Sequence, residues 1–126
     1  MRRTAAQFGL TEDSWAAAKD QIRGAILQAA YERRMTWRAE IAGQVGAINL
    51  DPDSPLMSDL LAAVSEDEYA AGGPALTSIV TARYGDQEPS PTFYAEARTL
   101  GYRFTEPLTF WSGEVQKVFA EHGMRR

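Results

Sequence analysis

The feature that most constrains this chain is a set of small and apolar residues that recurs every three or four positions between residues 12 and 33. That spacing places them on one face of an α-helix. Thr11 is a good N-cap for it, and Glu12 and Asp13 follow in the expected first turn. A helix with one apolar face has to bury that face against other elements. The face consists of Trp15, Ala18, Ile22, Ala25, Ile26 and Ala29.

Start and stop signals indicate several further helices. Thr36 is a second candidate N-cap, and Ser54 followed by Pro55 combines a capping serine with proline at the first helical position. Gly101 suits the left-handed position that ends many helices. We predict these helices at about 36–45, 54–70 and 93–100, and a last helix that begins at Thr105 or Pro107 and is ended by Gly123.

A different period indicates a minor β element. Residues 75–83 alternate and are rich in β-branched side chains, which favours a strand. A turn at 84–86 follows, and 102–104 is a second candidate strand. We therefore predict a mainly α fold with a minor β element (α+β). It would be one domain over 1–126, with a loose lead-in at 1–10, three helices, a short strand or hairpin and two C-terminal helices.

The residues needed for common catalytic and metal centres are missing. The chain has no cysteine, and its one histidine, His122, follows the last apolar stripe without a serine or aspartate partner set by the sequence. The sequence Asp51-Pro52-Asp53 resembles the start of a calcium loop but lacks the glycine at position six and the glutamate at position twelve. We therefore expect no catalytic residues, no metal, no cofactor and no enzymatic activity.

Hydropathy gives an expectation for location. No apolar run approaches the roughly 18 residues that would span a bilayer. Gln7 and Gly9 interrupt the segment in which a signal peptide would need its apolar region. We expect a cytoplasmic protein that does not associate with a membrane, and the sequence indicates no oligomeric state.

The element order resembles that of a winged helix-turn-helix. Within it, Thr36–Ala42 resembles the Thr-Tyr-Gly-x-Ile-Ala helix of alkylguanine alkyltransferases and alkyltransferase-like proteins, and Pro74–Thr77 falls where their Pro-Cys-His-Arg strand begins. The resemblance covers about 36–84 and implies a DNA-binding fold. The reactive cysteine and its histidine are absent, so alkyl transfer is excluded. The helix at 54–70 also lacks the family's arginine.

Basic and aromatic residues near the expected wing suggest nucleic-acid binding. Arginines that converge could contact phosphates. The expected third helix has a net charge of −4 and would be repelled by DNA, so contacts should come from elsewhere. Our leading hypothesis is a regulatory module that binds nucleic acid, DNA in particular, through backbone contacts. Its candidate residues are Arg33, Arg34, Arg38, Trp37, Arg83 and Tyr84.

The acidic block at 51–70 supports an alternative. It contains six acidic residues and no basic one, and the run at 66–68 is expected to face solvent. Such a surface could steer a basic protein partner to the helix. The residues nominated for this interaction are Asp59, Glu66, Asp67, Glu68 and Tyr69.

Overall fold

The computed structural model describes residues 3–124, and its longest element is the helix expected first. α1 runs from Glu12 to Tyr31, and the Thr11 hydroxyl caps it by accepting a hydrogen bond from the Ser14 N–H. The expected apolar face is buried along its length. Before α1, residues 6–8 form one 3₁₀ turn, and Phe8 stacks on Trp15, so the lead-in packs against the core.

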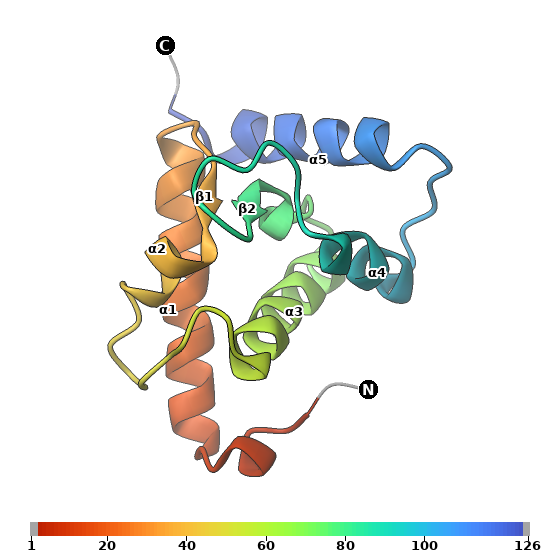
Figure 1. The fold of residues 1–126 in the computed structure, drawn as a ribbon. Coiled ribbons are helices and arrows are strands. Elements are labelled where there is room, and N and C mark those ends of the chain that lie inside the picture. The colour runs from red at the N-terminus through yellow and green to blue at the C-terminus, as the bar shows by residue number, and fades with distance from the viewer. Residues whose placement is uncertain (1–2, 125–126) are drawn as a thin grey trace.

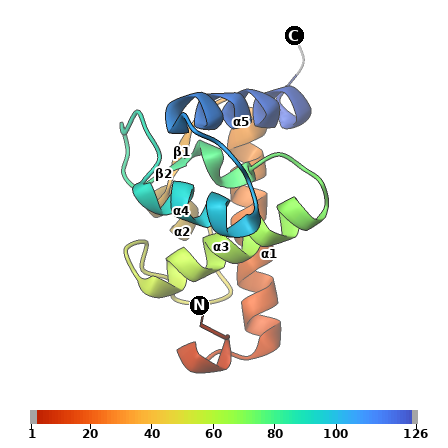
Figure 2. The same ribbon diagram turned by 90° about the vertical axis from the view of Figure 1, so that its right-hand side faces the viewer.

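Two helices of 16 residues and one of 10 residues follow α1 along the chain. α3 runs from Pro55 to Ala70, and the Ser54 hydroxyl caps it by accepting from the Met57 N–H, as the serine–proline signal predicts. α4 covers Pro91–Leu100, and α5 covers Pro107–His122. Figures 1 and 2 show α3 crossing α1, with α5 lying over the end of α1. The fold is therefore mainly helical with a minor β element.

The β element differs from the expected strand at 75–83. Only Val80–Thr81 forms a strand, β2, whereas Leu76–Ile79 forms a 3₁₀ turn, η2. Side chains of α5 explain the difference: the Trp111 indole donates to the Ser78 carbonyl at 2.7 Å, and the Ala75 N–H donates to a Glu114 carboxylate at 3.0 Å. These contacts satisfy backbone groups that a strand would have paired with a neighbouring strand.

The partner of β2 is also different from the expected structure. Residues 36–45 were predicted as one helix, but Thr36–Trp37 forms strand β1, and α2 covers only Arg38–Ala42. β1 and β2 pair in parallel, with Thr36 opposite Val80 and Trp37 opposite Thr81. The Thr81 hydroxyl also donates to the Thr36 carbonyl at 3.3 Å.

The segment between α4 and α5 forms a second, aromatic cluster. Gly101 ends α4 at φ 113°, the left-handed conformation that its residue type predicts. The expected strand at 102–104 is absent, because Tyr102 and Phe104 instead pack on Phe110 of α5, with ring centroids 5.3 and 4.2 Å away. Within residues 3–124, no helix has the length and apolar character required to cross a membrane.

Candidate nucleic-acid interface

The parallel β1–β2 pair brings four of the six nominated residues to one edge. In a parallel pair both strands run in the same direction, so the residues that follow them leave at the same end. Trp37 and Arg38 lie at the end of β1, and Arg83 and Tyr84 follow β2. The rings of Trp37 and Tyr84 meet edge to face, with centroids 4.7 Å apart. We call these four residues the sheet-edge surface.

A hydrogen-bonded turn presents Tyr84 to solvent. The Arg83 N–H donates to the Asp86 carboxylate at 3.1 Å, and the Asp86 N–H donates to the Arg83 carbonyl at 3.2 Å. The Thr81 hydroxyl donates to the same carbonyl at 2.9 Å, which ties the turn to β2. Tyr84 is 78% exposed, and the Arg83 side chain is also exposed. The aromatic ring and the cation are therefore both accessible to a ligand.

Arg38 lies deeper, at the mouth of a cleft. Its guanidinium donates to the Ser58 hydroxyl of α3 at 3.0 Å. Burial lowers its pKa below the usual arginine range, although the charge of Asp53 opposes this shift. The cleft lies between α3, β2 and the start of α4 and has a volume of about 50 Å³. Arg38 is half-buried and forms no ion pair with any residue in the described part of the chain.

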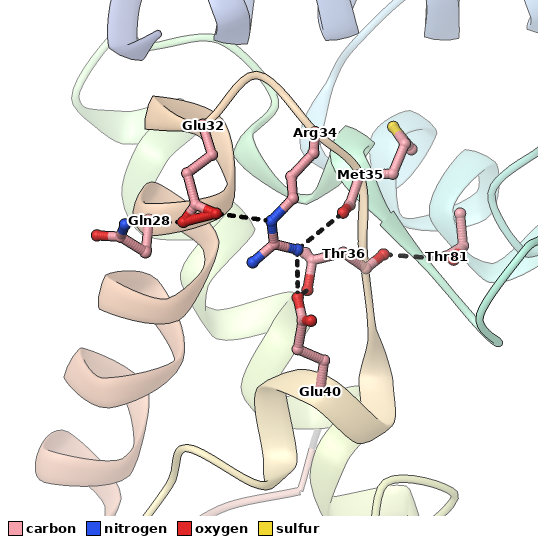
Figure 3. Close-up of polar contacts among 7 residues, drawn as sticks. All are labelled: Gln28, Glu32, Arg34, Met35, Thr36, Glu40 and Thr81. Atoms are coloured by element: carbon pink, nitrogen blue, oxygen red, sulfur yellow. Dashed lines mark hydrogen bonds and ion pairs between the residues drawn. The ribbon is translucent and has the colours of Figure 1, made fainter. Parts of the chain in front are cut away.

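Arg34 is held in an internal clamp (Figure 3). Its guanidinium pairs with Glu40 at 2.6 Å and with Glu32 at 3.0 Å, and it donates to the Met35 carbonyl at 3.2 Å. Hydrogen bonds to Glu40 and then Glu32 raise its pKa. The Thr36 hydroxyl also donates to Glu40, at 2.7 Å. Two carboxylates thus compensate the cation that the sequence nominated for phosphate contact.

Arg33 is also occupied by a structural contact. It adopts a left-handed backbone conformation with φ 55°, just after the end of α1. Its Nε donates to the Met124 carbonyl at 3.0 Å, and the Met124 N–H donates to the Tyr31 carbonyl at 2.8 Å. Arg33 therefore fastens the end of α5 to the end of α1 and lies apart from the sheet-edge surface.

The acidic helix is partly neutralised from within the fold. Asp67 pairs with Lys19 of α1 at 2.8 Å, and Glu68 pairs with Arg23 of the same helix. Glu68 is only 7% exposed, so the expectation that the whole run 66–68 faces solvent is wrong for this residue. α3 packs on α1 there, and Arg23 of α1 pairs with the buried carboxylate.

The other residues nominated for a protein partner are dispersed along α3. Asp59 accepts a hydrogen bond from the Arg3 N–H at 3.0 Å, and Glu66 is half-buried. Tyr69 is 41% exposed and packs edge-on against Tyr102, with centroids 5.0 Å apart. The structure therefore does not bring these residues together into one open acidic face.

One buried polar residue, Glu114, was not predicted from the sequence. Glu114 is 4% exposed in the middle of α5, where it accepts from the Ala75 N–H and pairs with Lys117 at 2.8 Å. Glu114 lies between Trp111 and Val118 on the apolar face of this helix, and that position could have indicated that it is buried. Within residues 3–124, no cluster of three or more histidine, cysteine or acidic side chains could hold a metal ion.

Comparison of this chain with protein-family models, curated proteins and solved structures gives no match.

Proposed function

We propose that this protein is a non-enzymatic, regulatory module that binds nucleic acid through the sheet-edge surface. The observation that carries the proposal is that the parallel strands bring Arg38 and Arg83 to the same edge as the contact between half-buried Trp37 and exposed Tyr84. Arginine contacts phosphate oxygens through paired N–H donors, and an exposed ring stacks on an unpaired base. Backbone contact, rather than base readout by α3, is the expected binding mode.

The charge of α3 supports this choice of surface. A helix with four acidic residues and no basic one is repelled by a phosphate backbone, and its apolar face is already buried in the core. Tyr84 is presented outside the helical layer and can approach a strand without α3 entering a groove. We therefore expect a preference for single-stranded over duplex nucleic acid, because only unpaired bases offer a free face to the ring.

The cation count sets the expected salt dependence. Two arginines that contact phosphates should give a slope of log affinity against log salt of about −1.4 for a single strand. The net charge of −4 works against binding, so the affinity should be greatest at low salt. Fluorescence anisotropy with a labelled single-stranded oligonucleotide and its duplex, at low and moderate salt, measures both properties.

Point variants separate the proposed surface from general charge effects. Tyr84→Ala should weaken binding by about tenfold, because stacking contributes roughly 1–3 kcal/mol per base. Arg83→Gln should weaken it and make the salt slope shallower. Arg103→Gln is the matched control, since Arg103 is an exposed arginine in the connector between α4 and α5. Absence of binding at 50 mM salt, or equal losses in Arg83→Gln and Arg103→Gln, would contradict the proposal.

The alternative partner, a basic protein that binds Asp59, Glu66, Asp67, Glu68 and Tyr69, has less support. Lys19 and Arg23 already compensate two of its carboxylates, which weakens the field available for steering. The variant Asp67→Lys tests it, because Asp67 is exposed whereas Glu68 is buried. Loss of capture of a basic partner in this variant, with oligonucleotide binding absent, would favour the alternative.

A further inference from the structure

The cleft beside the sheet-edge surface is lined by hydroxyl groups around one cation. On α3, Ser58, Leu61, Ala62 and Ser65 follow the three- and four-residue spacing of one helix face and form its floor. Side chains of Thr81, Ser90 and Thr92 also line it, together with the Phe93 ring, although the Thr81 hydroxyl already donates to backbone carbonyls. A volume of about 50 Å³ accommodates roughly four water-sized groups, which is comparable to the four oxygens of a phosphate.

Arg38 supplies the cation at one end of this cleft. It differs from Arg34, which two carboxylates hold, because its hydrogen-bond partner is the neutral Ser58 hydroxyl. The half-buried guanidinium has lost part of its hydration without gaining an ion pair within residues 3–124. An oxyanion would compensate that loss through charge-assisted hydrogen bonds.

Hydroxyl groups near this end can complete the coordination of an oxyanion. Ser90 precedes α4 and lines the cleft, and its side chain makes no capping hydrogen bond to that helix. Thr92 follows it into the cleft. Ser65 and Thr77 instead bond to each other at 2.8 Å, farther along α3. The Ser65 and Thr77 hydroxyls are therefore engaged with each other, and the proposed donors are those of Ser58, Ser90 and Thr92.

The opposite end of the cleft carries a carboxylate. Glu96 lines the cleft and also a smaller cavity that it shares with Ser65, Thr77 and Tyr102. Ser58 and Ser65 are seven residues apart on α3, which corresponds to about 10 Å along the helix axis. An anion at Arg38 is therefore attracted by a close cation and more weakly repelled by a distant carboxylate.

We propose that the Arg38 end of this cleft binds a phosphate group. The inference rests on the proposed function in one respect: a phosphate of a bound strand would enter the cleft while its base stacks on Tyr84. The same chemistry would also accept inorganic phosphate or a phosphate monoester. The two sources differ in whether free phosphate competes with the strand.

The test is a titration of the ¹⁵N-labelled protein with inorganic phosphate at constant ionic strength, followed through the backbone amides. Shifts should concentrate at Ser58, Ser90 and Thr92. Arg38→Met should weaken phosphate binding by about tenfold, in line with the loss of a charge-assisted hydrogen bond. Glu96→Gln should strengthen it by roughly threefold, because it removes the repelling charge. Weaker phosphate binding in Arg38→Met together with stronger binding in Glu96→Gln would indicate an electrostatic site, because a general loss of structure would weaken binding in both variants.

Thermal melting shows whether Arg38→Met is folded, and Arg38→Lys provides a second test of the site if it is not. Lysine retains the charge but not the planar fork, so this variant should fold and bind phosphate more weakly than the wild type. Phosphate shifts that are absent, that lie outside the cleft, or that persist equally in both Arg38 variants would overturn the proposal.

A competition experiment between inorganic phosphate and a labelled single strand distinguishes the two sources of the phosphate group. It also distinguishes failure of the proposed function from failure of the phosphate site. Displacement of a labelled single strand by phosphate would identify the strand as the source, and phosphate binding without displacement would identify a free phosphate ligand. Phosphate binding in the absence of any oligonucleotide binding refutes the proposed function alone. Oligonucleotide binding that depends on Tyr84, without phosphate shifts in the cleft, refutes the further inference alone.

Discussion

Replacement of Glu40 by glutamine should destabilise the protein by about 1.5 kcal/mol at pH 7. The Glu40 carboxylate accepts from Arg34 at 2.6 Å and from Thr36 at 2.7 Å, and its side chain is 21% exposed. A hydrogen bond to a charged group contributes about 1 kcal/mol more than a neutral one, which gives about 2 kcal/mol for the two bonds. The Arg34 side chain is 38% exposed, so solvent screening reduces this value.

The assay is urea unfolding followed by tryptophan fluorescence. With an m-value of about 2 kcal/mol per molar urea, Glu40→Gln should lower the midpoint by roughly 0.7 M. In a double-mutant cycle with Arg34→Met, the coupling energy should be about 1 kcal/mol. Glu121→Gln is the control, because Glu121 is exposed on α5, and its midpoint should stay close to that of the wild type.

The effect should depend on pH in a defined direction. Burial raises the pKa of Glu40, but the hydrogen bonds from Arg34 and Thr36 outweigh it, and the net pKa is lowered. A carboxylate whose folded pKa is depressed stabilises the fold above its unfolded pKa of about 4.3, and the contribution is lost as pH falls through the folded pKa. The wild type and Glu40→Gln should therefore converge in acid. Equal losses at pH 7 and pH 3, or a loss below about 0.5 kcal/mol, would refute this reasoning.

Two further predictions concern the aromatic cluster. Gly101→Ala should cost about 1–3 kcal/mol in thermal melting, because φ is 113° and the new Cβ would lie 2.8 Å from the Tyr69 hydroxyl oxygen. Gly113→Ala should instead add about 0.5–1 kcal/mol, since its Cβ meets nothing within 4 Å on a helix, and a loss there would contradict the contrast. Burial, followed by the charge of Glu114, raises the pKa of Tyr102 to about 12. Its neutral phenol therefore stabilises the fold below its unfolded pKa of about 10, and this contribution is lost as pH rises through 12. An ultraviolet titration of Tyr102→Phe should lack the ionisation step near pH 12, and an unchanged curve would contradict this assignment.

The helices could be predicted because their signals are local. The Thr11 and Ser54 caps act on N–H groups three residues away, and each is present where the sequence predicts it. Gly101 takes the left-handed conformation for the same reason, since its backbone preference does not depend on distant residues. Apolar spacing then identifies the buried face of α1, whatever packs against it.

The β element could not be predicted because it depends on distant partners. Residues 75–83 alternate like a strand, but Trp111 and Glu114 of α5 hold 75–78 in another conformation. Trp37 looked like the first residue of a helix face and instead pairs with Thr81. Neither contact has a signal in the sequence around it, so residue type alone could not distinguish the alternatives.

Residue type likewise does not decide what each charged side chain does. Arg34 and Arg38 are four positions apart, yet one is clamped by two glutamates and the other lines a cleft. Glu68 and Asp67 are adjacent, yet one is buried and the other exposed. The packing of the helices determines which arginines remain accessible. The sequence identifies the candidate arginines but not their accessibility.

The parallel pairing of β1 and β2 also determines when the sheet-edge surface can exist. Thr36 and Thr81 lie 45 positions apart, and closing a loop of that length costs about 3 kcal/mol of chain entropy. A ladder of two residue pairs offsets little of this, whereas α5 packs on η2 and holds its backbone through Trp111 and Glu114. A nascent chain that ends before Pro107 carries all four surface residues but lacks the helix that stabilises their arrangement. During synthesis, we therefore expect the sheet-edge surface to become ordered only after α5 has been made.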